Sequence, residues 1–577
     1  MARLDPHSYA DDSQPQVARF TWRARVDFGS RTLTCEVDLH FAAPSQGVVD
    51  LDTRELTIDS VSGARFELAA GEPILGARLR LTLPSGTSKV TIAYRTQPGA
   101  SALQWLEPAQ TAGGTQPFLF SQCQAIHARS LVPLQDSPRC RVPYEAVLTV
   151  PRALRAVMGA APVSRVEEGE VVHESFVMSQ PIPPYLLAFA VGELASRDLS
   201  PRSRVWAEPS VVDAAAWEFA EVEAMMVAAE SLYGPYDWER FDLLTMPPSF
   251  PYGGMENPRL TFVTPALVVG DRSLVDVVAH ELAHSWTGNL VTNANAEHFW
   301  LNEGFTVYAE RRIIEVLHGV EAHALSSALG RRELDAAVAQ FASAPGLTRL
   351  RTELNGIDPD EAFSVVPYEK GFLFLCLLER QVGRPAFEAW LKRWLSAHRF
   401  GAVTTEDFLA SVEGDFPGVL AAVRAPEWVD GAGVPSNAPS FSSARLAAVE
   451  ALGSTAPEAE LAKRWSPTEW VLWLDRLPRS LPVEMLRALE ARFSLSGSKN
   501  PEIAVAWARL ALSAGDASVL PRVESLVGTY GRMKYLKPLY AGLMARPEFV
   551  QVARACFGKF KARYHPIAQS VVARLVG

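Results

Sequence analysis

Residues 277–293 read VVAHELAHSWTGNLVTN, and the first half of this stretch decides what the centre of the chain can be. His280 and His284 stand four positions apart, so on a helix their imidazoles share one face. Two imidazoles one turn apart can hold a single metal ion. Glu281 points to the side of that face, where it can reach a water molecule on the metal. The apolar neighbours indicate a largely buried helix, in which polar side chains need partners.

Glu303 offers a third ligand, in the stretch WLNEGFTVYAE that spans residues 300–310. It follows His284 after eighteen residues, and the apolar residues around it recur at helical spacing. A helix, a connection and a second helix can bring a carboxylate back to the histidine pair. Two histidines and one carboxylate leave a fourth position for water, as in catalytic zinc sites. We therefore predict one Zn2+ per chain on His280, His284 and Glu303, although cobalt and manganese also suit these ligands.

Glu281 is predicted to be the general base of this site. A bound metal lowers the pKa of its water, and a neighbouring carboxylate can then take the proton. Glu310 lies two turns beyond Glu303 on the second helix. It either orients a zinc ligand from behind or is a solvated surface residue, and the sequence leaves both interpretations open.

The composition is that of a folded protein with an acidic balance. Of the 577 residues, 48% are hydrophobic and 21% are charged, which excludes a wholly disordered chain. The 55 Lys and Arg against 65 Asp and Glu give a formal net charge of -10. Proteins whose main partner is nucleic acid usually carry a basic excess, so we expect no nucleic-acid partner.

The cysteines and the amino terminus indicate the compartment. The five cysteines are odd in number and widely spaced, and no CxxC pair occurs, which argues against a disulfide framework and suits a reducing environment. The start of the chain, MARLDPHSYADDSQPQ, lacks the apolar segment of a signal peptide. The longest apolar runs are far shorter than the roughly 20 residues of a membrane-spanning helix. We expect a cytoplasmic protein without a membrane partner.

The first third of the chain has the two-residue period of β-strands. Apolar and polar residues alternate in residues 20–39 on both sides of the turn signal Gly29-Ser30, which predicts a half-buried hairpin. Residues 79–94 repeat the pattern around PSGTSK, which predicts a second hairpin. The β character continues to about residue 193.

Helical periodicity dominates the rest of the chain. Residues 210–232 and 300–317 are predicted helices, and Asp271 or Ser273 can cap the helix that carries the histidine pair. The stretch APEWVDGAGVPSNAPSFSS (425–443) breaks the periodicity, as a linker does. These changes predict a multidomain α+β chain whose parts are a β domain (1–193), a catalytic domain (194–424), the linker (425–443) and an α-helical domain (444–577).

Several further motifs carry a resemblance to a known family. The two zinc stretches and the segment PYGGMENP (251–258) resemble the zinc aminopeptidases of the gluzincin class. Four more segments are similar to the leukotriene A(4) hydrolase subfamily: SALQWLEP (101–108), FSQCQAIHARSLVPLQDSP (120–138), IDPDEAFSVVPYEKGF (357–372) and GRMKYLKPLY (531–540). The resemblance runs from about residue 20 to the end of the chain. It implies an amino-terminal β-sheet domain, a thermolysin-like catalytic domain and a helical domain of the HEAT or armadillo kind.

The resemblance implies how the amino end of a peptide is held. Glu256 matches the residue that binds the free α-amino group, and Gln124 matches a second contact to that amine. An anion at a fixed distance from the metal lets only the first peptide bond reach it, and the ion pair is strong in a closed cleft. The neighbouring residues are expected to bind the extended peptide, in part through their main chain; they are Tyr252, Gly253, Gly254 and Met255.

The resemblance assigns four other side chains. Tyr368 matches the donor of a hydrogen bond to the oxyanion. Asp360 matches a residue at the bottom of the substrate cavity, where it would favour a basic first residue. Arg532 and Lys534 match residues that bind a peptide's carboxylate, and an Arg suits this because its fork makes two parallel bonds. Without the resemblance, Asp360 would be interpreted as a turn residue, and Arg532 and Lys534 as surface charges.

Two positions depart from the animal enzymes of the subfamily. Phe363 stands where those enzymes often carry Tyr, so a hydroxyl beside the cavity is lost. That change bears on the handling of a lipid epoxide more than on peptide hydrolysis. Phe305 replaces a residue that is commonly His, and we expect it to alter packing rather than metal binding.

The function we predict is a monomeric zinc aminopeptidase that releases the first residue of short peptides, above all tripeptides with arginine in first place. Two alternatives stay open at this point. One is a hydrolase of a fatty-acid epoxide that uses the same metal, with Gln124, Asp360 and Tyr368 around the substrate. The other is a peptide-binding protein on an inactive peptidase fold. This alternative is disfavoured because the predicted metal ligands, the base Glu281 and Tyr368 are all present.

Overall fold

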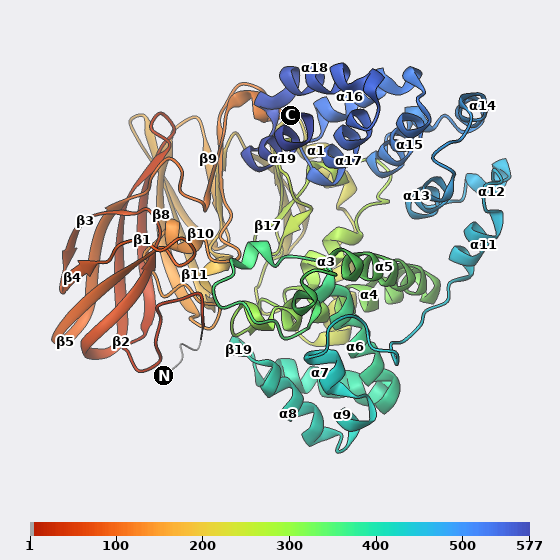
Figure 1. Cartoon of the computed structure of the whole chain (residues 1–577). Coiled ribbons are helices and arrows are strands. Elements are labelled where there is room, and N and C mark those ends of the chain that lie inside the picture. The colour runs from red at the N-terminus through yellow and green to blue at the C-terminus, as the bar shows by residue number, and fades with distance from the viewer. Residues whose placement is uncertain (1–4) are drawn as a thin grey trace.

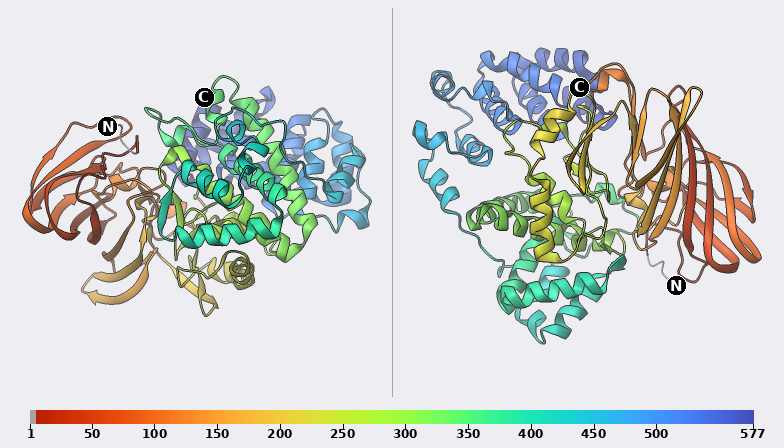
Figure 2. Two further views of the ribbon diagram at one scale, coloured as in Figure 1. Left: turned by 90° about the horizontal axis from the view of Figure 1, so that it is seen from below. Right: turned by 180° about the vertical axis from the view of Figure 1, so that it is seen from behind.

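The structure is a computed structural model that describes residues 5–577, and the chain forms three parts in sequence order (Figure 1). An amino-terminal β-sheet domain, a central catalytic domain and a carboxy-terminal helical domain each enclose a buried apolar cluster. The eight-stranded sheet forms one end of the molecule, and helices α11 to α14 form the opposite end (Figure 2). The predicted fold class is confirmed.

The amino-terminal part contains two sheets. The larger sheet has the order β10 (Ala161–Glu168), β11 (Val171–Ile182), β8 (Val142–Pro151), β1 (Val17–Asp27), β2 (Thr32–Thr53), β5 (Ala77–Arg95) and β3 (Thr57–Ser62), with β4 (Arg65–Leu68) also paired to β5. The smaller sheet has the order β6 (Leu103–Leu106), β7 (Phe118–Ser121), β12 (Phe189–Gly192) and β9 (Arg155–Met158).

The first predicted hairpin is confirmed and the second is wrong. Strands β1 and β2 pair antiparallel, with Trp22 opposite Val37 and both side chains buried. The residues around PSGTSK instead form one continuous strand, β5. Because β2 is equally long, both halves of β5 pair with it across a bulge, and no turn is needed.

The catalytic part combines a five-stranded sheet with helices. The sheet has the order β13 (Ala195–Ser200), β14 (Ser203–Ala207), β15 (Leu243–Thr245), β17 (Thr261–Val263) and β16 (Gly254–Met255), and β18 (Val291–Asn293) pairs with β19 (Gly401–Val403). The helices are α1 (Val212–Glu218), α2 (Val222–Tyr233), α3 (Asp276–Ala283), α4 (Trp300–His318), α5 (Val320–Gln340), α6 (Val366–Val382), α7 (Arg384–Ala397), α8 (Thr405–Asp415), α9 (Val419–Ala422) and α10 (Ala425–Val429).

The helix with the histidine pair begins later than predicted. Neither Asp271 nor Ser273 caps it, since α3 starts at Asp276 with Val275 at the capping position. Asp271 instead accepts a hydrogen bond from the backbone N–H of Ser273, at 2.9 Å, and so closes a turn before the helix.

The carboxy-terminal part is helical throughout. Its helices are α11 (Ala444–Leu452), α12 (Ala459–Ala462), α13 (Pro467–Arg476), α14 (Val483–Phe493), α15 (Pro501–Ala514), α16 (Leu520–Thr529), α17 (Met533–Met544), α18 (Val550–Phe560) and α19 (Pro566–Val576). The stretch 425–443 starts as helix α10, whose Trp428 is buried in the catalytic core, and the remainder runs without a helix to α11. The domain boundaries drawn from the sequence stay predictions.

The three parts touch one another through hydrogen bonds. Gln110 of the amino-terminal part donates to the carbonyl of Tyr564 at 2.8 Å. Arg141 donates to the carbonyl of Asn289 in the catalytic part at 2.7 Å. The loop before α17 reaches the segment that precedes β16, where the N–H of Met533 donates to the carbonyl of Pro251 at 3.2 Å. Within residues 5–577 each helix is too short or too polar to cross a lipid bilayer.

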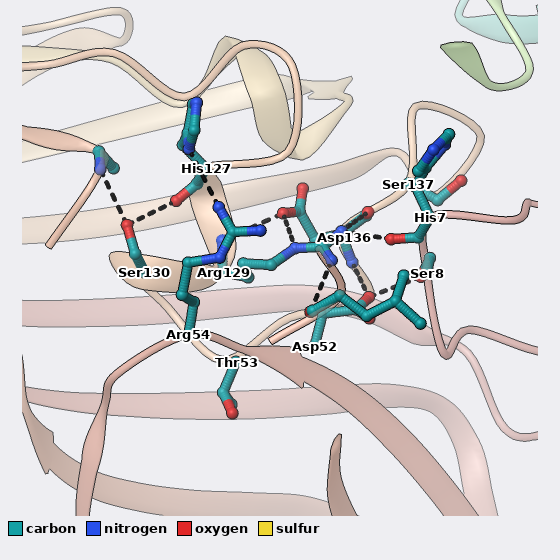
Figure 3. A network of polar contacts seen from close by, with 12 residues as sticks. His7, Ser8, Asp52, Thr53, Arg54, His127, Arg129, Ser130, Asp136 and Ser137 are labelled. Carbon is teal, nitrogen blue, oxygen red and sulfur yellow. Dashed lines mark hydrogen bonds and ion pairs between the residues drawn. The ribbon is translucent and has the colours of Figure 1, made fainter. Parts of the chain in front are cut away.

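A buried polar network fastens the start of the chain (Figure 3). Arg129 donates to the Asp136 carboxylate at 2.9 Å and to the carbonyl of His7 at 2.7 Å. Asp52 accepts from the Ser8 hydroxyl at 2.6 Å and from the backbone N–H of Asp136 at 2.8 Å. Burial raises the pKa of Asp52 to about 6. The network places His7 against the loop that leads to Asp360, as described below.

The raised pKa of Asp52 predicts a pH dependence of stability. A carboxyl group whose pKa rises from 3.8 to about 6 on folding contributes stability below pH 4 that is lost as the pH rises through 6. The full effect is about 3 kcal/mol. Asp52→Asn cannot titrate, so chemical unfolding at pH 4 and pH 7 should show the wild type losing that much more stability than the variant. Parallel pH profiles of the two proteins would contradict the prediction.

Candidate active site

The histidine pair lies at the end of α3. His280 is in the last turn of the helix, His284 is its carboxy-terminal cap, and the two ring centroids are 4.9 Å apart. Each ring is held through Nδ1: His280 by a Glu310 oxygen at 2.9 Å, and His284 by the carbonyl of Thr287 at 3.1 Å. Partners on Nδ1 leave both Nε2 atoms to bind a metal. This contact favours the interpretation that Glu310 orients a predicted zinc ligand over the interpretation that it is a solvated surface residue.

Glu303 completes the set from the first turn of α4. Its Oε2 lies 3.5 Å from Nε2 of His280 and 3.5 Å from Nε2 of His284. This oxygen is buried and has no hydrogen-bond partner among residues 5–577. The three ligand atoms lie within 4.8 Å of one another. A buried carboxylate oxygen aimed at two imidazole nitrogens fits a divalent cation, and nitrogen and carboxylate ligands suit zinc.

Two glycines bring the helices of the site together. An added Cβ on Gly304 of α4 would lie 2.7 Å from the Cα of Gly371 in α6, so only a pair without side chains permits this approach. Glu303 precedes Gly304, and Tyr368 lies one turn before Gly371. The contact therefore sets the distance between Glu303 and Tyr368. Neither glycine has a predicted role, because the local sequence pattern does not indicate that α4 and α6 cross at these two positions.

Three buried carboxylates give the site a strongly negative centre. Glu256, Glu281 and Glu303 are each at most 6% exposed. Burial raises the pKa of Glu281 to about 8, and burial with the charges of Glu303 and Glu281 raises the pKa of Glu256 well above its usual range. Glu256, Glu281 and His284 also form a second cluster within ligand distance of one another. Such a centre is stabilised by cations, which a metal ion and a protonated amine both supply.

The histidines respond differently to this setting. Burial lowers the pKa of His284 to about 4, so its ring is neutral, as a metal ligand must be. Burial also acts to lower the pKa of His280, but the Glu303 carboxylate facing its Nε2 and the Glu310 carboxylate on its Nδ1 raise it overall. A divalent cation between these groups would take the place of the proton on His280.

The GGMEN segment (253–257) lies beside these buried carboxylates. Gln124 donates to the Glu256 carboxylate at 3.3 Å, which brings together the two residues predicted to bind an amine. Gly254 and Met255 form β16, which within the described part of the chain (5–577) pairs with β17 alone, at the edge of the five-stranded sheet. An edge strand presents free main-chain groups with which an extended peptide can pair. Tyr252 packs on Phe250, with ring centroids 5.5 Å apart.

Tyr368 lies over the metal ligands. Its ring stacks on His280 at 6.2 Å between centroids and at 18° between planes. Burial and the charge of Glu303 raise the pKa of Tyr368, so its hydroxyl keeps the proton that a hydrogen-bond donor needs.

The loop with Asp360 forms one side of the approach to the site. Asp360 accepts a hydrogen bond from His127 at 2.9 Å, and its side chain is half exposed. His7 holds the base of this loop, since its Nε2 lies 3.0 Å from the carbonyl of Leu354 and 2.9 Å from that of Ile357. Phe363 is 60% exposed, with its ring 5.9 Å from that of Tyr368.

The two departures from the subfamily take different places. Phe363 is at the open side of the site, whereas Phe305 is buried between Trp300 and Phe408 at centroid distances of 6.1 Å and 5.7 Å. Phe305 therefore packs in the core of the catalytic part.

Arg532 and Lys534 differ in their surroundings. The Arg532 side chain is only 12% exposed, and an added Cβ on Gly253 would lie 3.0 Å from its Nη2. Arg532 thus comes from the carboxy-terminal part to the GGMEN segment. Lys534 is 57% exposed and pairs with Glu502 at 2.8 Å. Arg532 lies 3.8 Å from the same Glu502 carboxylate and donates to the Tyr535 hydroxyl at 3.2 Å, so the structure brings it next to the site in a more buried and more distant pairing with Glu502 than Lys534 has.

Some residues of the site were missed by the sequence analysis. Asn289 donates to the carbonyl of Glu256 at 2.7 Å, and Thr306 lies 3.1 Å from Nδ1 of His284. Tyr185 accepts from Asn302 at 3.3 Å behind the site. Asn289 falls within the quoted zinc stretch, but a single amide or hydroxyl carries no spacing signal that would single it out.

Three families match the chain in succession. Residues 6–186 match the Peptidase M1 N-terminal domain, residues 217–423 the Peptidase family M1 domain, and residues 465–576 the family described as Leukotriene A4 hydrolase, C-terminal. Among curated proteins, leukotriene A-4 hydrolase of Xenopus laevis is 38% identical over 99% of this chain and 98% of its own length. Leucine aminopeptidase 2 of Neurospora crassa is 35% identical over 99% of this chain and 90% of its own length.

Solved structures agree with these matches. Leukotriene A4 hydrolase from Saccharomyces cerevisiae superposes with a TM-score of 0.91 at 32% identity, over 100% of this chain and 98% of the yeast chain. The complex of the yeast LTA4 hydrolase with bestatin gives a TM-score of 0.92 at 31% identity, over 100% and 97% of the two chains. An M1 zinc metallopeptidase from Deinococcus radiodurans shares the fold over 76% of this chain, with a TM-score of 0.61 at 20% identity.

The geometry around Gly254 predicts a selective loss of activity. An added Cβ on Gly254 would lie 2.2 Å from Oε1 of Glu281, so Gly254→Ala must displace that carboxylate. We expect metal content to stay normal and hydrolysis to fall about 100-fold, as for a misplacement of about 1 Å. Gly253→Ala is the matched control for kcat on a tripeptide amide, because its Cβ would meet the guanidinium of Arg532 and not Glu281. Equal losses in the two variants would contradict the prediction.

Proposed function

The chain belongs to the M1 family of zinc aminopeptidases, and we propose that it removes the first residue of short peptides, tripeptides above all. The observation that carries the proposal is the unpartnered Oε2 of Glu303, which lies 3.5 Å from both Nε2 atoms of the histidine pair within residues 5–577. Glu256 and Glu281 stand beside that centre. Together they supply a metal site, a base and an anion for an amine.

The metal ligands and Glu281 have separate roles in the proposed reaction. Zinc held by His280, His284 and Glu303, one ion per chain, would supply a Lewis acid for the scissile carbonyl and the attacking water. The Glu281 carboxylate takes a proton from that water and later passes it to the leaving amine. Its pKa of about 8 on burial falls once a cation is bound nearby, so the carboxylate can accept the proton at neutral pH.

Tyr368 stabilises the charge that develops on the carbonyl oxygen. Its hydroxyl stays protonated because burial and Glu303 raise its pKa, and its ring is fixed on His280. A donor that is already in place strengthens its hydrogen bond as the oxygen becomes negative, and one such donor contributes about 3 kcal/mol.

Glu256 and Gln124 measure the peptide from its amino end. The buried Glu256 carboxylate has two like charges near it, so a protonated α-amine is a strongly favoured neighbour. The amide of Gln124 fixes the orientation of Glu256, and its own oxygen can accept from the same amine. The peptide backbone then pairs with the edge strand at Gly253, Gly254 and Met255, and Tyr252 packs alongside it.

Arg532 limits the length of the peptide. Its guanidinium reaches the GGMEN segment from the carboxy-terminal part and can bind the carboxylate of a short peptide with two parallel bonds. Lys534 adds positive charge, which Glu502 partly offsets. Asp360 would favour a basic first residue, above all arginine.

The remaining expectations concern the setting of the enzyme. We expect it to act as a cytoplasmic monomer on peptides, without nucleic acid or membrane as a partner. The net charge of -10 and the five free cysteines support this proposal.

A second activity has one observation in its favour. A relative named leukotriene A-4 hydrolase matches the full chain, and the carboxy-terminal family carries the same name. A fatty-acid epoxide would use the same metal, with Gln124, Asp360 and Tyr368 near the substrate. Phe363 supplies an apolar contact but no hydroxyl. Product analysis with such an epoxide distinguishes this activity from peptide hydrolysis. The alternative of an inactive peptide-binding protein conflicts with the intact set of ligands, base and donor.

The experiment that tests the proposal compares a free arginyl tripeptide with its N-acetylated form on zinc-loaded protein. Acetylation removes the charge that Glu256 binds, so we expect cleavage of the free peptide and a loss of about 100-fold or more with the acetylated one, as for a lost buried charge contact. Equal rates would contradict the role of Glu256, and no cleavage of either would contradict the aminopeptidase. As a control, Glu281→Gln with full zinc should lose about 100- to 10,000-fold in kcat.

The contact of Arg532 predicts a dependence on the peptide's carboxylate. Arg532→Met should raise KM for a free-acid tripeptide about tenfold or more, because charge-assisted bonds are lost, and leave the tripeptide amide nearly unchanged. Lys534→Met should have a smaller effect, since Glu502 already binds its ammonium. Steady-state kinetics with both peptides checks this, and an equal rise in KM for acid and amide would argue against the role.

A further inference from the structure

His127 connects the amino-terminal part to the Asp360 loop. Its Nε2 lies 2.9 Å from the Asp360 carboxylate, and its Nδ1 lies 2.9 Å from the Ser101 hydroxyl and 3.4 Å from Nη1 of Arg54. Figure 3 shows Arg54 directed at the ring of His127. Arg54 is itself fixed, because its backbone N–H donates to the carbonyl of Arg129 at 2.9 Å and its guanidinium bonds the carbonyl of Ile74.

These partners assign the hydrogen on the His127 ring. A guanidinium has only hydrogens to offer, so Nδ1 accepts from Arg54 and the ring hydrogen is on Nε2. That hydrogen is donated to Asp360, which as a carboxylate can only accept. The Nε2–H is thereby directed at Asp360, and Arg54 and Ser101 hold the ring from its other side.

The hydrogen bond from His127 orients the Asp360 carboxylate. The Asp360 side chain is 53% exposed and can thus meet a ligand. The other titratable groups around this pair are Asp358 and Tyr252, which face Asp360 from its own loop and from the GGMEN segment, and Arg129 and Asp136 behind Arg54.

The position of Asp360 relates it to the first residue of a peptide. His127 follows Gln124 by three residues, and Gln124 contacts the proposed amine anchor Glu256. From the other side, the charge of Asp360 acts on Tyr252 of the GGMEN segment. The carboxylate therefore lies at the side of the site where the amino end of the peptide is held. His7 keeps the loop in place from its base, through the carbonyls of Leu354 and Ile357.

We propose that His127, held by Arg54 and Ser101, is a positioning residue that keeps the Asp360 carboxylate aimed at the substrate, so that the enzyme selects peptides with a cationic first side chain. This rests on the proposed aminopeptidase function and adds the residues that set its specificity. His127 does not touch the reacting atoms, so it should change the choice of substrate and leave the chemical step as it is.

The test compares two tripeptides on the zinc-loaded full chain, Arg-Gly-Gly and citrulline-Gly-Gly. Citrulline has the length of arginine but an uncharged urea at its end, so the ratio of the two kcat/KM values isolates the charge. We expect the wild type to prefer arginine about ten- to a hundredfold, and Asp360→Asn to bring the ratio close to one.

Variants of His127 separate positioning from general structure. His127→Leu should lower the ratio at least about fivefold, while kcat on the citrulline peptide stays within about twofold of the wild type. His127→Gln, whose amide can still donate to Asp360, should restore most of the ratio. In the Asp360→Asn background, His127→Leu should have no further effect on the ratio, because both changes act through one carboxylate.

A matched control is present elsewhere in the chain. His173 on β11 has the same kind of partners, with the Thr149 hydroxyl 2.9 Å from Nδ1 and a Glu168 oxygen 3.1 Å from Nε2. His173→Leu should leave the ratio unchanged, and zinc content and melting temperature are measured for every variant.

The outcomes distinguish a failure of the proposed role of His127 from a failure of the proposed aminopeptidase function. Cleavage of both peptides with a wild-type ratio near one overturns the inference and leaves the aminopeptidase intact. A wild-type ratio retained in His127→Leu also overturns it, as does an equal loss on both peptides that Gln does not rescue. Cleavage of neither peptide overturns the proposed function, and the inference with it.

Discussion

The site depends on the convergence of buried negative charge on two imidazoles. Glu303 reaches both Nε2 atoms at 3.5 Å, and Glu256 and Glu281 are buried beside it. Such a group of carboxylates is costly to bury without cations. A metal ion and a protonated amine meet that need, so the electrostatic requirement of the fold and the chemistry of an aminopeptidase coincide. The glycine contact between α4 and α6 makes the convergence sterically possible.

All three domains contribute residues to the proposed substrate site. The catalytic part holds the metal ligands, the base and the edge strand, the amino-terminal part contributes Gln124 and His127, and the carboxy-terminal part contributes Arg532. Hydrogen bonds between domains, such as that of Met533 to Pro251, fix these contributions relative to the metal. In the proposed function a peptide is thus measured from both ends by groups that belong to different domains, and the proposed length selectivity depends on the assembly of the three parts.

The contacts of a charged residue decide what it can do. Arg532 and Lys534 both face Glu502, but Arg532 is mostly buried at the GGMEN segment and 3.8 Å from that carboxylate, whereas Lys534 is exposed and pairs with it at 2.8 Å. Asp360 is held by a hydrogen bond with His127, whose ring Arg54 contacts from the other side. From the sequence, all three residues were equally compatible with solvated surface positions.

Local spacing by itself determined the metal motif, the first hairpin and the order of β, mixed and helical parts, because these depend on residues close together in the chain. The tertiary structure alone decided that β5 is one strand, since its partner β2 had to be long enough to pair with both halves. It also decided the meeting of Gly304 with Gly371 and of His127 with Asp360. Those contacts join residues far apart in sequence, and the local periodicity of a segment does not predict which distant surface it packs against.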